Sequence, residues 1–189
     1  MTTLANKTAE DKRKIVGTGT NLETARFRTI LSRELDVPVG MVEAYVGGEH
    51  GDAAVPLWSI VRIDGLPLDE YLQRAGRKLD KAKCEDYVKE VSREVIRVLG
   101  GTRYGPAGSF VDIVRGIVLN TGKVLSYSRL RKFETTPEPV HVTVPARIAR
   151  SLGPDLWDLL SEQEKEGIKE AARIIHQTYS EIKGGTPLR

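Results

Sequence analysis

The sequence predicts a domain of the α+β class. Segments 82–99 and 161–182 place apolar residues at helical spacing with charged residues between them. Segments 41–46 and 55–63 are apolar and β-branched, and the glycine-rich stretch between them predicts a hairpin. With 189 residues, 40% hydrophobic and 29% charged, the chain is long enough to bury a core and too ordinary in composition for a disordered or collagen-like protein.

The first part of the chain is expected to alternate helix and strand. Residues 1–14 have helix-forming composition, and Ile15-Val16 predicts a short strand. Thr20 or Asn21 can cap a helix that runs to about Leu35. The hairpin follows, and its second strand is expected to end at the turn Asp64-Gly65.

The second part is expected to be richer in helix. The helix over 82–99 ends at Gly100-Gly101, and its apolar face consists of Cys84, Val88, Val91, Val95 and Val98. The next helix begins near Pro106 and ends at Gly122, and we expect an apolar stripe to face the core at Ala107, Phe110, Val111, Val114, Ile117 and Val118. Strands are predicted over 123–130 and 140–144. Ser161 and Glu164 form a capping box for the last helix, which ends at Gly184-Gly185.

Charge and cysteine content exclude several classes of protein. The 29 Lys and Arg residues are interspersed with 26 Asp and Glu residues, whereas a nucleic-acid binder gathers its positive charge on one face. No apolar run approaches the ~20 residues of a membrane span, and the N-terminus lacks a signal-peptide core. We therefore expect neither nucleic acid nor membrane as a partner. The single cysteine, Cys84, allows a reducing compartment, and the expected location is cytoplasmic.

Three stretches are candidates for chemistry. The turn Gly17-Thr18-Gly19-Thr20-Asn21-Leu22 resembles a dinucleotide-binding turn, but Leu22 replaces the third glycine, so we expect no nucleotide there. Glu23 and Arg26 share a helix face. They form either a surface ion pair that adds little to stability, or a site where the arginine guanidinium binds a small carboxylate through two parallel hydrogen bonds. Spacing does not decide between these two interpretations.

The third stretch contains His50, which lies in a glycine-rich segment at the end of a predicted strand. Histidine is the side chain best suited to exchange a proton near neutral pH. An acid such as Glu23 could hold its imidazole in one tautomer and stabilise the cation. His141 and His176 lack such surroundings and metal-ligand spacing, so we interpret both as structural and expect no metal.

Taken together, these stretches resemble the lactate/malate dehydrogenase family. The resemblance rests on residues 17–28, on Gly-Glu-His-Gly-Asp at 48–52 with Val-Pro-Leu-Trp-Ser at 55–59, and on segments 101–107, 144–146 and 160–165. It implies the fold of the family's C-terminal domain, an antiparallel sheet packed with long helices. Residues 1–14 would be the remnant of a lead helix, and residues 15–189 would form that domain.

The resemblance implies roles for five residues. His50 would be the general acid/base that gives a proton to the 2-keto oxygen and takes it back. Arg26 would grip the substrate carboxylate, Thr102 would line the substrate pocket, and Pro106 would pack near the nicotinamide of NAD. Glu23 stands where the family has an aspartate that orients the histidine, and its carboxylate reaches one methylene further.

Length is the second departure from the family, whose members begin with a nucleotide-binding half that this chain is expected to lack. The resemblance therefore implies the substrate-binding and catalytic half of an NAD-dependent L-2-hydroxyacid dehydrogenase, inactive without the NAD-binding half. Lactate is preferred as substrate, with malate as the runner-up. The alternative is a non-catalytic binding or assembly module. The expected partners are a small 2-hydroxy or 2-keto carboxylic acid and either further copies of the chain, as a homo-oligomer, or an NAD-binding half.

Overall fold

The computed structural model describes residues 2–8 and 15–183 and has the predicted α+β class. Its α-helices are α1 (Thr2–Thr8), α2 (Asn21–Leu35), α3 (Leu68–Ala75), α4 (Lys81–Leu99), α5 (Tyr104–Val118) and α6 (Glu162–Lys183). Its strands are β1 (Val42–Glu43), β2 (Val46–Gly48), β3 (Ala54–Pro56), β4 (Arg62–Ile63), β5 (Leu66–Pro67), β6 (Lys123–Leu125), β7 (Ser128–Arg131), β8 (Val140–Thr143), β9 (Ala146–Ile148) and β10 (Leu152–Asp155). Residues 9–14 and the predicted helix end at 184–185 lie outside the described residues.

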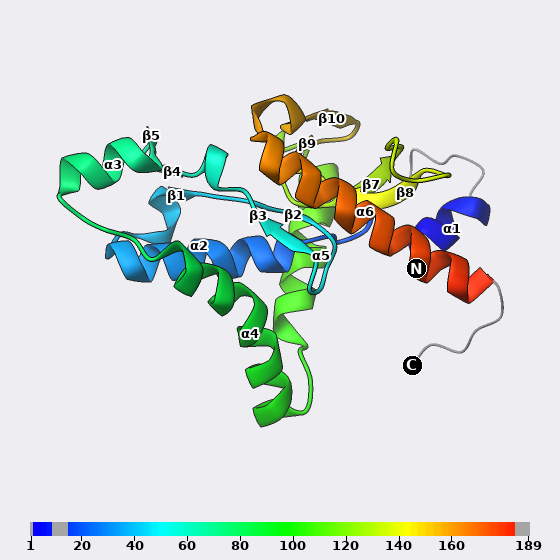
Figure 1. Cartoon of the computed structure of the whole chain (residues 1–189), viewed down its shortest axis with the longest axis horizontal. Coiled ribbons are helices and arrows are strands. Elements are labelled where there is room, and N and C mark those ends of the chain that lie inside the picture. Colours follow the sequence, from blue (N-terminus) through cyan, green and yellow to red (C-terminus); the bar gives the residue numbers. More distant parts are fainter. Residues whose placement is uncertain (1, 9–14, 184–189) are drawn as a thin grey trace.

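The strands form three small antiparallel sheets, which Figure 1 shows with their helices. Their strand orders are β3-β2-β8-β7, β10-β9-β6 and β1-β4-β5. The predicted hairpin is present but divided between two sheets, because β2 pairs with β3 and β1 pairs with β4. A 3₁₀ turn at Trp58–Ile60 interrupts its second strand, and there the Trp58 ring packs edge-on against Phe27 at a centroid distance of 4.8 Å.

Two helices organise the largest parts of the core. The buried face of α2 carries Phe27 and Leu31 and packs against Cys84 and Val88 of α4. Burial raises the pKa of the Cys84 thiol to about 11, which suits a packing residue and not a nucleophile. On the other side of the domain, α6 covers the strand β8, whose valines pack against Ile168. This arrangement fixes α2, α4 and the β2–β3 hairpin beside one another.

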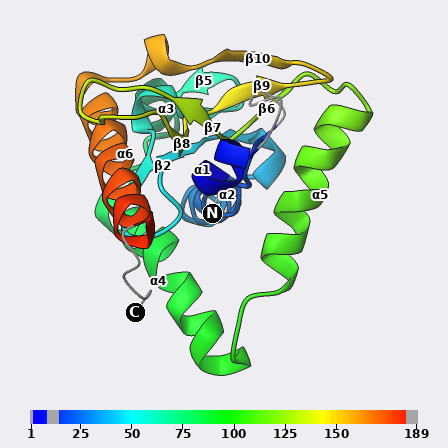
Figure 2. The same cartoon turned by 90° about the vertical axis from the view of Figure 1, so that its right-hand side faces the viewer.

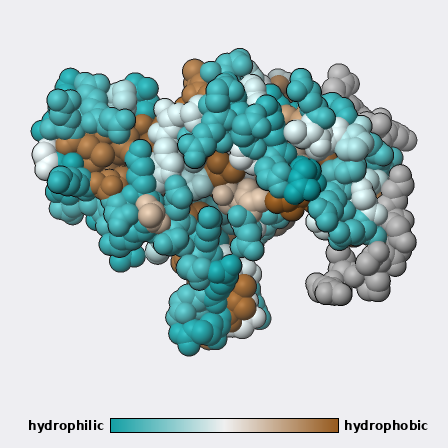
Figure 3. Space-filling model, in the orientation of Figure 1, coloured by the Kyte–Doolittle hydropathy of each residue, from teal (hydrophilic) through white to brown (hydrophobic). Residues whose placement is uncertain are grey.

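The apolar stripe expected to place α5 in the core is wrong for most of its members, because only Ile117 packs against core residues and most of that face is exposed. Four of its residues are 52–63% exposed: Phe110 (61%), Val111 (52%), Val114 (55%) and Val118 (63%). The buried positions of α5 are instead Ser109, Ile113 and Gly116. Figures 1 and 2 show that the end of α4 and the start of α5 extend away from the sheets, where the two helices are joined. Part of the resulting apolar surface is visible on this projection in Figure 3.

Three local predictions also change. Ile15-Val16 forms no strand, and the chain there makes a single bridge between Gly17 and Ser128. The helix α2 has the predicted bounds, but the Thr20 hydroxyl donates to the carbonyl of Val46 at 2.5 Å and does not cap the helix. The turn Asp64-Gly65 has two positive φ angles, 51° and 77°, and leads into the short strand β5, which together with α3 was not predicted.

Candidate active site

The β2–β3 hairpin carries His50 on the loop at its tip. Gly48 opens this loop with φ of +83°, and a Cβ there would lie 2.4 Å from the carbonyl oxygen of Ala53. Glycine is therefore required for the loop to close in this form. The His50 side chain is 61% exposed, so its imidazole is accessible to a small molecule.

Glu23, in the first turn of α2, contacts this imidazole. Its Oε1 atom lies 2.8 Å from Nδ1 of His50, and its side chain is only 6% exposed. The hydrogen bond to Glu23 raises the pKa of His50 above its ordinary value, although burial acts in the opposite direction. Because the carboxylate accepts from Nδ1–H, the tautomer of the neutral ring leaves Nε2 as the nitrogen that can exchange a proton.

Arg26 lies one helical turn after Glu23, and its side chain is 11% exposed. Its Nη1 atom donates to Oγ of Ser92 on α4 at 2.5 Å and to Oε1 of Glu23 at 3.3 Å. Glu23 and Arg26 thus form the predicted ion pair, but it is not a surface pair, since both side chains are largely buried. Glu23 joins the histidine and the arginine through one oxygen atom.

These side chains line one cavity of about 260 Å³. The structure brings together four of the residues proposed from the sequence, namely His50, Glu23, Arg26 and Thr102. The helix α4 adds three polar residues that the sequence analysis did not single out: Lys89, Ser92 and Arg93. Arg93 also pairs with Asp52 of the His50 loop at 3.3 Å and so links α4 to the hairpin.

A second cavity of about 420 Å³ adjoins the first and shares Arg26 and Thr102 with it. Pro106, in the first turn of α5, lines this second cavity with mostly apolar neighbours such as Val95 and Leu99. Apolar walls suit a flat ring without charge more than a phosphate. Pro106, the fifth predicted residue, thus lines the second cavity and not the cavity that contains His50.

The family profile described as lactate/malate dehydrogenase, alpha/beta C-terminal domain, matches residues 20–184. The chain belongs to the lactate/malate dehydrogenase family. Among its relatives, the malate dehydrogenase of Sulfolobus acidocaldarius is 39% identical over 164 residues, which cover 87% of this chain and 51% of that protein. The L-lactate dehydrogenase of Shouchella clausii is 35% identical over 175 residues, covering 90% and 54%.

A solved structure of the lactate/malate dehydrogenase family has a similar fold. The L-lactate dehydrogenase of Clostridium thermocellum superposes with a TM-score of 0.79 at 30% identity, covering 92% of this chain and 57% of that chain. The predicted family and fold are therefore confirmed. The chain spans about half the length of the curated relatives that it matches.

In this family member, the glycine turn before α2 is filled by the protein itself. A Cβ on Gly19 would lie 2.3 Å from Oγ1 of Thr143 and 2.6 Å from the backbone nitrogen of Ser128. The N–H and carbonyl of Gly17 are both hydrogen-bonded to Ser128, at 3.0 Å each. A pyrophosphate needs free backbone N–H groups and open space at such a turn. Its packing agrees with the expectation that no nucleotide binds there.

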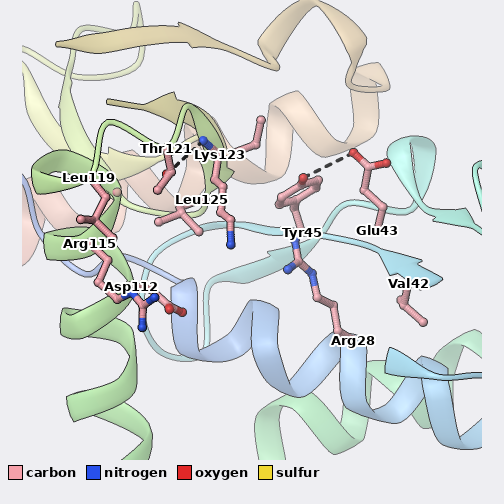
Figure 4. Close-up of a pocket in the computed structure, with 12 residues that line it drawn as sticks. Arg28, Val42, Glu43, Tyr45, Asp112, Arg115, Leu119, Thr121, Lys123 and Leu125 are labelled. Atoms are coloured by element: carbon pink, nitrogen blue, oxygen red, sulfur yellow. Dashed lines mark hydrogen bonds between the residues drawn. The ribbon is translucent and has the colours of Figure 1, made fainter. Parts of the chain in front are cut away.

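A different cleft, about 600 Å³ in volume, lies between β1–β2 and α5 (Figure 4). Its walls mix the charges of Arg28, Arg115 and Lys123 with those of Glu43 and Asp112. Arg28 is engaged in packing, since its Nε donates to the carbonyl of Ala44 at 2.9 Å and its guanidinium lies 4.9 Å from the Tyr45 ring centroid. None of the five predicted site residues lines this cleft, so the candidate chemistry belongs to the His50 cavity.

The remaining histidines, His141 and His176, do not line the His50 cavity. His141 is buried in β8 with Nε2 at 3.1 Å from the carbonyl of Ile15, and burial lowers its pKa. His176 lies on α6. In the ranges 2–8 and 15–183, no group of three or more His, Cys, Asp or Glu side chains forms a possible metal site. None of the helices described there is long and apolar enough to cross a membrane.

Proposed function

We propose that this chain is the substrate-binding and catalytic half of an NAD-dependent L-2-hydroxyacid dehydrogenase. It would interconvert lactate and pyruvate, or malate and oxaloacetate, when an NAD-binding half is present. The observation that carries the proposal is the shared Oε1 of Glu23, 2.8 Å from His50 Nδ1 and 3.3 Å from Arg26 Nη1. A proton-exchanging imidazole and a guanidinium thus line one small cavity.

Arg26 binds the substrate in this proposal. A guanidinium and a carboxylate form two parallel charge-assisted hydrogen bonds, which fix both position and orientation. Few orientations then remain for the second carbon of a 2-keto acid in a cavity of about 260 Å³. Such fixed geometry accounts for a large part of the rate that an enzyme gains from positioning.

His50 acts as the general acid/base in this proposal. In reduction, its Nε2–H donates a proton to the 2-keto oxygen while a hydride is added to the second carbon, which yields the 2-hydroxy acid. In oxidation, neutral Nε2 accepts the hydroxyl proton as the hydride leaves. Glu23 accepts the hydrogen bond from Nδ1–H and so stabilises the imidazolium.

NAD, when bound, supplies or accepts the hydride. The residues that would pack against its nicotinamide are Pro106, Val95 and Leu99, in the largely apolar cavity that Arg26 and Thr102 also line. The filled turn at Gly17 and Gly19 offers no place for the phosphates. We therefore propose that the phosphates and the adenosine are held by a separate NAD-binding half.

Both substrate pairs stay within the proposal, because the matched relatives are named malate dehydrogenase and L-lactate dehydrogenase. The motifs at 48–52 and 55–59 favour lactate. Lys89 favours malate, since it adds a cation to the cavity that also holds Arg26, whereas Arg93 is already paired with Asp52. A second carboxylate would find a partner there, whereas a methyl group would not.

The proposal is tested with the 189-residue chain and with oxamate, a carboxylate analogue of pyruvate. Nuclear magnetic resonance titration should show oxamate shifting the His50 ring signals, with much weaker binding in Arg26→Lys, whose point charge cannot form the two parallel bonds. Equal binding by wild type and Arg26→Lys, or no binding by wild type, contradicts the proposal.

Turnover is assayed with NADH and either pyruvate or oxaloacetate. We expect none from the chain alone, and turnover after addition of the part of the Sulfolobus acidocaldarius relative that this chain does not match. His50→Asn should abolish it. Turnover by the chain alone that disappears in His50→Ala overturns the need for a second half. Oxamate binding without turnover in the combined sample favours the non-catalytic module.

A further inference from the structure

We propose that Ser92 is a positioning residue, which holds the Arg26 guanidinium for the substrate carboxylate and so leaves the charge of Glu23 to His50. This inference rests on the proposed function. It concerns a residue of α4, which lies 66 positions from Arg26 in the sequence. Ser92 itself is not proposed to touch the reacting atoms.

The buried face of α4 that packs against α2 is apolar at Cys84 and Val88 and polar at Ser92. Cys84 and Val88 are 0% and 2% exposed and pack against α2. One further step of four residues along the same face reaches Ser92, which lines the cavity with Arg26. An apolar residue would continue the stripe, whereas the hydroxyl at this position meets the guanidinium of Arg26 on α2.

Arg26 Nη1 has two acceptors at different distances. Oγ of Ser92 is 2.5 Å away, and Oε1 of Glu23 is 3.3 Å away. The same Oε1 lies closer to the imidazole, at 2.8 Å from Nδ1 of His50. The Ser92 hydroxyl thus draws the guanidinium toward α4. Without it, Nη1 would move onto Glu23, and the carboxylate would be shared more evenly between the two cations.

A purely structural serine makes different predictions. A serine inside a helix often bonds to a carbonyl of the preceding turn, and its replacement by alanine then leaves distant groups unchanged or favours the helix. The positioning role instead predicts two changes at other residues. In a variant without the Ser92 hydroxyl, the Arg26 guanidinium becomes misaligned for a carboxylate. The pKa of His50 falls because Glu23 then forms its closer contact with Arg26.

The pKa of His50 also depends on the other charges around it. Those that face it are Glu23 and Arg26 of α2, Glu49 and Asp52 of its own loop, and Lys89 and Arg93 of α4. All six remain in a Ser92 variant. A change in the His50 titration therefore reports a redistribution among them and not a lost charge.

The test uses three variants of the full chain: Ser92→Ala, Ser92→Thr, which keeps a hydroxyl, and Ser180→Ala as a matched control. The Ser180 hydroxyl bonds to the carbonyl of His176 on the exposed side of α6, at 2.9 Å. Circular dichroism checks that each variant is folded. Nuclear magnetic resonance gives the pKa of His50 without ligand, and the same titration with oxamate gives the dissociation constant.

We expect Ser92→Ala to lower the pKa of His50 and to weaken oxamate on the order of tenfold, the scale of one hydrogen bond to a charged group. Ser92→Thr should restore both, and Ser180→Ala should change neither. If oxamate binding depends on Arg26 while Ser92→Ala leaves the His50 pKa and the affinity unchanged, the positioning role is overturned and the proposed function stands. If binding does not depend on Arg26, the proposed function itself fails.

Discussion

The Nδ1 atom of His50 lies 2.8 Å from Oε1 of Glu23, which stands where the resemblance gives the family an aspartate. The longer side chain reaches the imidazole from the first turn of α2 and is 6% exposed. Its second oxygen, Oε2, is buried and has no hydrogen-bond partner among the described residues. The extra methylene therefore does not carry the carboxylate past the histidine.

This contact predicts a pH-dependent effect of Glu23→Gln. The variant keeps the size of the side chain and removes its charge, so the pKa of His50 should fall. In wild type the pKa of His50 is raised in the folded state, so the contact stabilises the fold fully below pH 6.5, the ordinary pKa of histidine. This stabilisation is lost as the pH rises through the pKa of His50 in the folded state. Because the ring is 61% exposed, solvent screening keeps the gain small.

The ring protons of His50 give its pKa directly by nuclear magnetic resonance, and urea unfolding at several pH values gives the stability difference. Wild type should exceed Glu23→Gln by more at acid pH than above the folded-state pKa. An unchanged His50 titration in the variant would show that Glu23 does not set its proton affinity. His141→Gln is the control and should leave the pKa of His50 unchanged, because the His141 ring contacts the carbonyl of Ile15 and does not line the cavity.

The glycine turn before α2 predicts a second contrast. Gly19→Ala should cost about 3 kcal/mol, because its φ of +54° disfavours a side chain and the new Cβ would meet Thr143 and Ser128. Gly122→Ala should cost only about 1 kcal/mol, since its φ is +64° but its nearest neighbour is an Arg147 nitrogen at 3.7 Å. Urea unfolding measures both. Equal losses would mean that packing does not explain the Gly19 position.

The capping box of α6 gives a third prediction. The Glu164 N–H donates to Ser161 Oγ at 3.3 Å, and the Ser161 N–H donates to Glu164 Oε2 at 2.9 Å, as predicted. Glu164 also accepts from the N–H and the hydroxyl of Ser59, so it ties α6 to the loop after β3. Ser161→Ala should cost about 1 kcal/mol and Glu164→Ala at least about 2 kcal/mol in thermal unfolding. The reverse order would show that the link to Ser59 adds nothing.

The helices were more predictable than the sheets, and the reasons are physical. Caps and spacing act within a few residues, so the bounds of α2 and the capping box at Ser161 could be read locally. The division of the hairpin depends on Trp58 packing against Phe27 of another element. Such a contact leaves no periodic signal in the strand itself.

The site shows the same division. Glu23 and Arg26 are one helical turn apart, and His50 lies in a glycine-rich stretch after a predicted strand, so these three could be proposed from the sequence. Ser92 and the pair of Asp52 with Arg93 could not, because they depend on how α4 lies against α2 and the hairpin. Their only local signal is a polar residue on the packing stripe of α4.

The exposed stripe of α5 is the clearest failure of sequence patterning, and it yields the last prediction. Apolar residues occupy both sides of this helix, so periodicity alone cannot tell which side is buried. Ile113 is 6% exposed and Phe110 is 61% exposed. Ile113→Ala should therefore cost about 3 kcal/mol as a core truncation, whereas Phe110→Ala should stay within about 0.5 kcal/mol.

The two alanine variants are matched, since both remove a large apolar side chain from the same helix. Thermal unfolding of each should be measured at two protein concentrations, because a face covered by another copy of the chain makes stability depend on concentration. A large loss in Phe110→Ala at low concentration, with none in Ile113→Ala, would show that the stripe packs inside the domain after all. A loss in Phe110→Ala that appears only at high concentration would instead identify the stripe as a contact between copies, because self-association is then what the aromatic ring stabilises.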